Sequence, residues 1–211
     1  MTRTEPTRLR RLMSRDRAAL DTLLASTVVG HVGFVDDGLP VVLPTAVVRW
    51  NDRLVIHGST GSRWMSAIAA GVPVCVAVTA VDGVLVARSA YESALLYRSA
   101  VLFGSFAPVG EDEAGTALDV LTERLLPGRV AEVRRPTRKE LAATQLLAMP
   151  IGEWSLRVLD EWPEDPADDV AGPAWAGHVR FGPTPTTVHD APDLRPGIPA
   201  PASVSAVDGI R

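Results

Sequence analysis

The sequence predicts a mainly β protein with flanking helices, closed as a barrel or a sandwich. Apolar runs short enough to be strands lie at about 28–35, 39–49, 53–58, 72–81, 83–88 and 98–108. Tight-turn residues punctuate them at Asp37-Gly38, Asn51-Asp52 and Asp82-Gly83. Many short strands joined by tight turns are typical of barrels and sandwiches, in which few strand edges stay exposed.

Helices are expected at about 14–26, 62–70, 111–126 and 137–147. Ser14 is expected to cap the first of them, and Thr137 with Glu140 has the spacing of a capping box for the last. A final strand from Trp154 to Asp160 would complete the barrel. The chain is therefore expected to form one domain over residues 1–160.

Residues 161–211 form a Pro/Ala-rich C-terminal arm in which regular structure is not expected to persist. The arm nevertheless contains Trp162, Trp175 and Phe181, which favour docking on the barrel or on a partner subunit.

The composition of the chain argues against several classes of function. The net charge of −4 and the pI of about 5.6 argue against nucleic acid or a membrane surface as partner. Neither a signal peptide nor an apolar run of membrane-spanning length is recognised, so a cytoplasmic protein is expected. Cys75 is the single cysteine, which excludes a disulfide within the chain. The histidines show no metal-triad spacing, and no metal site is predicted.

The segment from Ile56 to Arg63 has the composition of a phosphate-binding site. An apolar strand runs into Ser59, Thr60 and Ser62, with glycines that allow close backbone approach and an arginine that can bind phosphate oxygens. Such residues before a helix also serve as ordinary caps, which is the alternative interpretation.

Pro44 interrupts an otherwise regular strand pattern. Because proline cannot donate to a sheet ladder, this strand is expected to be an edge or to carry a bulge, and a flat ligand could lie there. A plain bulge without a ligand is the alternative. Arg88 and Arg98 flank apolar strands and need anionic partners, either a ligand or local carboxylates such as Glu92 or Asp82.

Together with His31–Val35, Leu39–Pro44 and the segments 87–93 and 96–104, the Ile56–Arg63 segment resembles the pyridoxamine 5'-phosphate oxidase-like family of FMN-binding split β-barrels. The resemblance covers about residues 8 to 160 and is closest to the nitroimidazole-resistance branch. It implies a homodimer with FMN sites shared between subunits. It also implies that the flavin ring lies along the strand at residues 42–45.

The resemblance assigns candidate residues to this site. The phosphate contacts would be Ser59, Ser62 and Arg63, and the ring contacts would be Leu43, Pro44 and Thr45. His57 and Arg98 would lie on the substrate side or make a second phosphate contact, with Ser99 lining the same site. His57 is the candidate catalytic residue, since the nitroimidazole-resistance branch has a histidine at the matching position.

The function implied is an FMN-dependent oxidoreductase acting on a small organic substrate. True pyridoxamine-phosphate oxidases carry an arginine-histidine pair in the C-terminal segment, and Glu153–Val158 has no histidine, which argues against vitamin B6 oxidation. A nitroimidazole-reductase-like or F420-dependent reductase is an alternative, although Lys139 as the only lysine favours FMN over F420. A non-catalytic flavin- or haem-binding protein is the alternative from another class.

Overall fold

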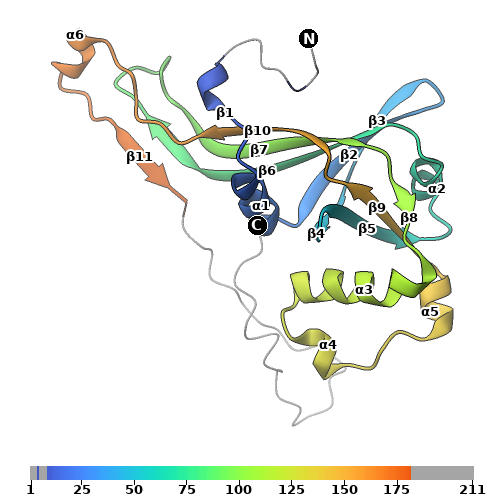
Figure 1. Ribbon diagram of the computed structural model, residues 1–211. Helices are drawn as coiled ribbons and strands as arrows, with labels where there is room; N and C mark the ends of the chain where they lie inside the picture. The colour runs from blue at the N-terminus through green and yellow to red at the C-terminus, as the bar shows by residue number, and fades with distance from the viewer. Residues whose placement is uncertain (1–3, 5–8, 182–211) are drawn as a thin grey trace, which may run out of the picture.

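The computed structural model describes Thr4 and residues 9–181, which build two antiparallel sheets (Figure 1). The larger sheet has the order β1 (Met13–Ser14), β10 (Glu153–Leu159), β7 (Ala94–Gly104), β6 (Val74–Val86), β2 (Val29–Asp36) and β3 (Leu39–Ala46). A further strand, β11 (Gly177–Arg180), also pairs with β6. The smaller sheet has the order β4 (Val48–Trp50), β5 (Arg53–Ser59), β9 (Thr144–Pro150) and β8 (Ala107–Pro108).

Most of the helices are short. They are the 3-10 turn η1 (Arg10–Leu12), α1 (Arg17–Ser26), α2 (Arg63–Ala69), α3 (Glu111–Leu125), α4 (Arg129–Glu132), α5 (Arg138–Ala142) and α6 (Ala167–Val170). None of them, within the described residues, is long and apolar enough to cross a membrane.

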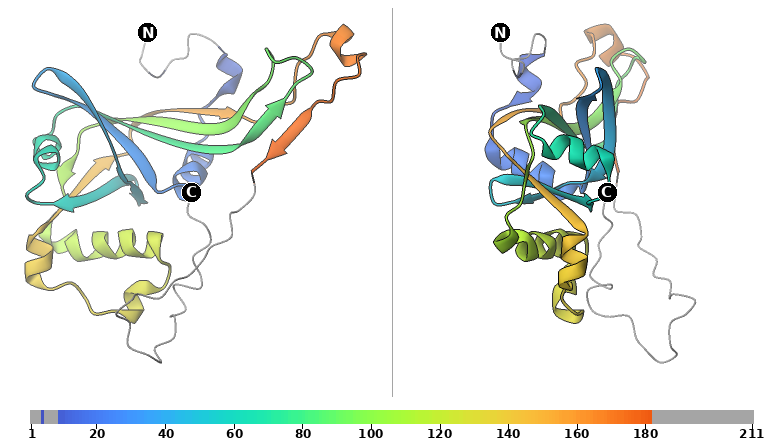
Figure 2. Two further views of the ribbon diagram at one scale, coloured as in Figure 1. Left: turned by 180° about the vertical axis from the view of Figure 1, so that it is seen from behind. Right: turned by 90° about the vertical axis from the view of Figure 1, so that its right-hand side faces the viewer.

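The main core lies between the inner faces of the two sheets. It contains Val32 and Val76 from the large sheet and Ile56 from the small one, and Leu20 of α1 and Met65 of α2 complete it. A second cluster lies on the other face of the small sheet, where α3 packs on it through Ala117 and Leu121. The small sheet is thus covered on both faces, and the mainly β fold with flanking helices is confirmed (Figure 2).

Pro44 lies in an edge strand, as its sequence context predicts. β3 ends the order of the large sheet and pairs with β2 in continuous register from Val29–Ala46 to Asp36–Leu39, without a bulge. Pro44 has no backbone N–H to donate, but no further strand lies on the open edge of β3 that would need this donor.

Several boundaries differ from the sequence prediction, and three of the differences are informative. The helix α1 is capped by Asp16, whose side chain accepts from the Ala18 N–H, while Ser14 belongs to β1. The expected helix at 137–147 stops at Ala142 because β9 begins at Thr144 and pairs with β5. Its capping box, however, is present as predicted.

The third difference concerns Asp82-Gly83, which forms a bulge inside one long strand and not a turn between two. The register of β6 on β7 shifts between Val81 and Gly83, where Gly83 has φ 155°. An added side chain at Gly83 would lie 2.3 Å from the Val179 carbonyl oxygen, so β11 can approach β6 here only because this residue is glycine.

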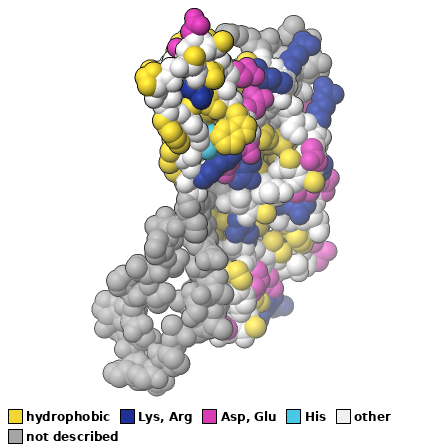
Figure 3. All heavy atoms as spheres, turned by 90° about the vertical axis from the view of Figure 1, so that its left-hand side faces the viewer, with side chains coloured by type: hydrophobic (Ala, Val, Ile, Leu, Met, Phe, Trp, Pro, Cys, Tyr) yellow, Lys and Arg dark blue, Asp and Glu magenta, His cyan; other side chains and the backbone are white. Residues whose placement is uncertain are grey.

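Regular structure continues into the arm, contrary to expectation. β11 pairs with residues 83–86 of β6, while β2 pairs with residues 75–78, so both strands lie along β6 at different ends. The β6–β7 hairpin and β11 project away from the barrel (Figures 1 and 2). Trp162 and Trp175 remain exposed at 69% and 65%. Figure 3, which faces the left-hand side of the view in Figure 1, shows hydrophobic side chains among charged ones. Residues 182–211 lie outside the described part of the chain.

Candidate functional site

The predicted phosphate-binding residues lie together where β5 meets α2. Ser59 ends β5, and Ser62 is the residue before α2, which begins at Arg63. The turn is held locally, since the Gly61 N–H donates to Ser59 Oγ at 3.2 Å and the Ser62 N–H to the Ser59 carbonyl at 3.0 Å. Ser62 makes no side-chain cap bond to α2. Its hydroxyl is therefore not used as an ordinary helix cap and is free to bind a ligand.

Arg63 points to the tip of the β2–β3 hairpin. Its Nη2 lies 3.0 Å from Asp36 Oδ2 and 3.2 Å from Asp37 Oδ2, and its side chain is 78% exposed. Exposed ion pairs of this kind hold a side chain weakly. Arg63 is thus oriented by two carboxylates but accessible to a ligand.

His57 lies on the face of β5 that carries α3. It is opposite Leu146 of β9, while the neighbouring Ile56 points into the main core. The His57 Nδ1 atom is buried and has no hydrogen-bond partner. A buried ring nitrogen without a partner costs free energy, so this atom is a candidate for contact with a bound group.

The other described histidines are less suited to such a contact. Both ring nitrogens of His178 are engaged, with Nε2 2.9 Å from the Glu161 carbonyl and Nδ1 3.2 Å from Arg180 Nη2. Its ring also stacks on Trp162 with centroids 4.0 Å apart. His31 is exposed on the outward face of β2, opposite Pro44.

The predicted ring contacts lie on β3, which touches β5. Their side chains cannot all face one ligand, because successive strand residues alternate. Leu43 packs against the main core, whereas Pro44 is exposed on the opposite face of the sheet. A flat ring could therefore meet the side chains of one face and the backbone of the open edge, but not all of Leu43, Pro44 and Thr45 through their side chains.

Arg98 and Ser99 lie apart from these residues. They are on β7, which β6 and β2 separate from β3. Arg98 makes a bidentate ion pair with Asp82, with Nε and Nη2 each 2.8 Å from a carboxylate oxygen. Hydrogen bonding to Asp82 raises the pKa of the Arg98 guanidinium. The local carboxylate, one of the two alternatives for this arginine, is its partner within the chain.

Arg88 has a partner that its sequence neighbourhood does not suggest. Its Nη1 lies 2.9 Å from Asp165 Oδ2, and its backbone N–H donates to Asp165 Oδ1 at 3.0 Å. The Asp165 side chain is fully buried. This pair joins the C-terminal arm to the end of β6 and is structural.

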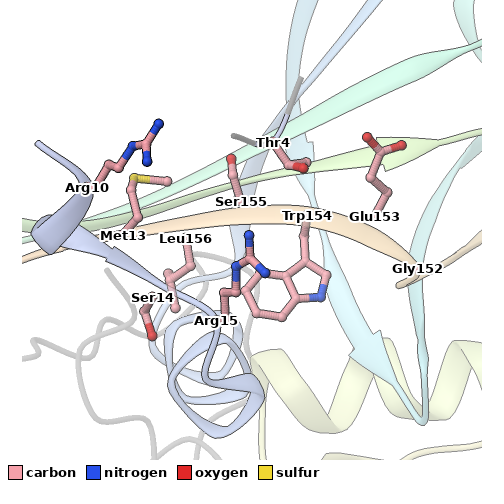
Figure 4. A pocket seen from close by; sticks show the side chains of 10 residues that line it. All are labelled: Thr4, Arg10, Met13, Ser14, Arg15, Gly152, Glu153, Trp154, Ser155 and Leu156. Atoms are coloured by element: carbon pink, nitrogen blue, oxygen red, sulfur yellow. The ribbon is translucent and has the colours of Figure 1, made fainter. Parts of the chain in front are cut away.

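A cavity of about 650 Å³ lies elsewhere, along the start of β10 (Figure 4). Glu153 and Ser155 point to one side of β10 and Trp154 to the other, with Arg10 and Arg15 on the facing segment (Figure 4). None of the predicted site residues lines this cavity. No group of three His, Cys, Asp or Glu side chains able to hold a metal ion occurs in the described part of the chain.

Asp36 and Asp37 are the residues of this region that sequence reasoning missed. The turn predicted at Asp37-Gly38 is confirmed, with Asp37 at φ 50° and Gly38 at φ 78°. Their contact with Arg63 depends on where the hairpin tip lies relative to α2 (Figure 1). No local pattern encodes this approach.

Comparison with known proteins identifies relatives. The family model "Pyridoxamine 5'-phosphate oxidase" matches residues 16–158. The structure of the FAD and heme binding protein from Mycobacterium smegmatis is 48% identical, with a TM-score of 0.90, and the match covers 94% of this chain and 98% of that one. The flavocytochrome Anf3 from Azotobacter vinelandii is 29% identical, also with a TM-score of 0.90, over 100% and 98% of the two chains.

A putative 5-nitroimidazole antibiotic resistance protein from Bacteroides thetaiotaomicron shares the fold at 16% identity, with a TM-score of 0.58 over 69% of this chain and 86% of that one. No curated protein sequence matches this chain significantly. The likenesses confirm the split-barrel fold class that the sequence predicts.

Proposed function

Because the chain belongs to the pyridoxamine 5'-phosphate oxidase family, we propose that it is a flavin-dependent oxidoreductase that also binds a haem. The observation that carries this proposal is the 48% identity, over nearly the full length of both chains, to a protein described as binding FAD and heme. The 29% identical flavocytochrome supports the same combination. FAD is accordingly the flavin we favour over the FMN that the sequence predicts.

The residues around β5 suit a flavin. Ser59, Ser62 and Arg63 would hold phosphate oxygens through two hydroxyls and a guanidinium, and the open edge of β3 would offer backbone groups to the ring. A bound flavin supplies hydride and single-electron chemistry, and the protein supplies binding and orientation.

Among the described histidines, we assign His57 to the haem and not to the flavin, because its buried Nδ1 lacks a partner. A haem iron is commonly held by a histidine nitrogen, and the nitrogens of His178 are already engaged. His57 is half-buried on the same face of β5 as Val55, which packs in the cluster with α3, so packing would restrict its orientation. A side chain held in this way can support a metal-bound group without losing much conformational entropy.

We further propose that the protein is a homodimer. Val29, Val35 and Val42 are exposed side chains on one outward face of β2 and β3. Exposed apolar side chains on one face of a sheet are typical of an interaction surface. Arg98 and Ser99, which lie away from the β5–α2 turn within one subunit, could belong to a flavin site only if a second subunit brings them there.

The experiment that tests the proposal is identification of the bound groups in the purified full chain, by visible absorption and by mass spectrometry of the material released on denaturation. FAD together with haem is the expected result. Flavin without haem would favour the simpler FMN- or FAD-dependent oxidoreductase of a small organic substrate. A chain that binds neither added flavin nor haem would contradict the proposal.

A further inference from the structure

The part of the large sheet that projects from the barrel carries one tryptophan on each face. It consists of the far ends of β6 and β7 together with β11 (Figures 1 and 2). Trp162 stacks on His178, whose strand neighbour Leu85 is buried on the same face. Trp175 lies on the opposite face, since a Cβ added at Gly177 would lie 2.7 Å from its ring. The first face is thus covered by the chain itself, whereas Trp175 stays 65% exposed on the second.

Trp175 belongs to an uncharged apolar patch. Three further side chains share its face, as the strand register shows, and are 42% to 54% exposed: Val81, Leu95 and Val179. We call these four residues the arm patch. The half-buried side chains between them on this face are uncharged as well, namely Val84, Val86 and Tyr97. Uncharged apolar surfaces of this kind typically mark interaction sites.

The arm patch continues the outward face of β2 and β3. β2 pairs with residues 75–78 of β6 and β11 with residues 83–86, so the two surfaces lie toward opposite ends of one strand. The exposed side chains of the first surface are Val29, Val35 and Val42. Together with the arm patch they expose on the order of 700 Å² of apolar surface, and an interface of standard size buries about 800 Å² on each partner.

We propose that the arm patch packs on the outward face of β2 and β3 in a second copy of this chain. The inference rests on the proposed homodimer and states which surfaces meet in it. In an isologous dimer every contact between two different surfaces occurs twice. A two-fold axis that lies between the facing sheets and crosses β6 at right angles reverses the direction of β6. Each arm patch then meets the partner's β2–β3 face, and all four apolar surfaces are covered.

The chemistry of the two surfaces favours a copy of the same chain as the partner. Both are faces of one sheet, and sheets pack on each other face to face at a spacing of about 10 Å. The arm patch alone exposes roughly half of the area that a standard interface buries on one partner. The net charge of −4 argues against a membrane surface as the partner. Trp175 and Val179 lie outside the family match, which ends at residue 158, so this contact would be particular to chains with such an arm.

The direct test is a cross-link between the two surfaces in the full chain. Val42→Cys and Val179→Cys are combined in a Cys75→Ser background and joined by a short bis-maleimide. Within one chain about 30 Å of strand separates the two positions, since Val42 is level with residue 75 of β6 and Val179 with residue 84. A short linker therefore joins them only between two chains. Denaturing electrophoresis should show a product of twice the chain mass in the double variant and not with either cysteine alone.

A second measurement follows the dimer dissociation constant by analytical ultracentrifugation. Val179→Asp should raise this constant tenfold or more, because the dimer would bury an unpaired charge in an apolar interface. Val133→Asp is the matched control and should leave the constant unchanged, since Val133 is similarly exposed, at 41%, but follows α4 on the far side of the small sheet. Far-UV circular dichroism checks that both variants keep the sheets.

The outcomes separate the inference from the proposed function. A dimeric parent chain that gives no cross-link in the double variant, and whose dissociation constant Val179→Asp leaves unchanged, would overturn the inference while the homodimer stands. A parent chain that is monomeric at micromolar concentration would overturn the inference and the homodimer together. Flavin and haem binding are measured separately by absorption, so neither result decides them.

Discussion

His57 shows how a single residue can connect sequence and chemistry. Its place after an apolar strand and before a turn rich in hydroxyl side chains made it a candidate, and the structure leaves its Nδ1 buried without a partner. A structural histidine would be expected to have found a hydrogen bond.

We expect His57→Ala to abolish the haem absorption band of the purified protein while His31→Ala leaves it unchanged. His57 is the proposed iron ligand, whereas His31 is an exposed residue of the outward sheet face. Absorption spectra of the two variants after haem addition make the comparison, and circular dichroism checks the fold. Loss of the band in His31→Ala alone would assign the haem to the other face of the molecule.

For individual residues, contacts within one turn could be predicted from the sequence, whereas contacts between distant segments of the chain could not. Ser59, Ser62 and Arg63 lie together because they are neighbours in sequence. Asp165 and Arg88 are 77 residues apart, and no pattern in the chain links them. The partners of charged side chains depend on the approach of whole elements, which periodicity does not describe.

At the scale of elements, the C-terminal arm is held to the β6–β7 hairpin by β11 and by the Arg88–Asp165 pair. Asp165→Ala should lower the free energy of unfolding by about 2 kcal/mol, because it removes a charged partner and leaves a largely buried guanidinium unpaired. Urea unfolding measures the change. The exposed Asp168→Ala is the control and should stay within about 0.5 kcal/mol of the parent. Equal stabilities of the two variants would show that the pair does not hold the arm.

Two helix-associated glutamates predict how stability depends on pH. Hydrogen bonding to Arg134 holds the pKa of Glu140 well below its usual range, and hydrogen bonding to Arg53 lowers the pKa of Glu113. A carboxylate whose pKa is lower in the folded state stabilises the fold above its unfolded pKa, and that contribution is lost as the pH falls through the folded value.

The melting temperature should therefore fall as the pH drops below about 4.3, the ordinary glutamate pKa. A Glu113→Gln/Glu140→Gln variant should show a shallower fall, and glutamine keeps the capping-box pattern at residue 140. Thermal melts across acidic buffers provide the measurement. Parallel curves for parent and variant would mean that these two groups do not contribute.

The local sequence pattern predicted helices, strands and turns correctly where the pairing of strands in the folded protein favoured the same structure. The hairpin at Asp37-Gly38 and the capping box at Thr137 formed as predicted, since both depend on a few adjacent residues. Asp82-Gly83 has a similar turn signature, but Asp82 pairs with Arg98 and the strand continues through a bulge. Likewise, β9 replaces the end of a predicted helix because β5 needs a partner strand.

For the whole molecule, the apolar outward face of β2 and β3 predicts self-association. Light scattering at micromolar concentration should give twice the chain mass of 22.5 kDa. Val42→Asp, at a side chain that is 63% exposed, should weaken the dimer without affecting the core, because a charge would be buried at the interface. A parent chain of monomeric mass that binds flavin tightly would contradict a site shared between subunits.

The fold class was predictable because strand length, turn residues and apolar periodicity all indicate a closed β structure. The proposed haem is only one of several alternatives that the sequence leaves open, since the four histidines of the chain show no diagnostic spacing. A haem site depends on how elements from distant parts of the chain pack, and that arrangement has no signature in one sequence.

The measurement that tests the central claim most directly is the visible absorption spectrum of the purified full chain during anaerobic reduction by a nicotinamide or by light with EDTA. A flavin-dependent oxidoreductase with a haem should lose its flavin bands, show the sharpened bands of reduced haem, and recover both spectra when an electron acceptor is added. A bound flavin that cannot be reduced, or that is reduced while the haem stays oxidised, would contradict the account.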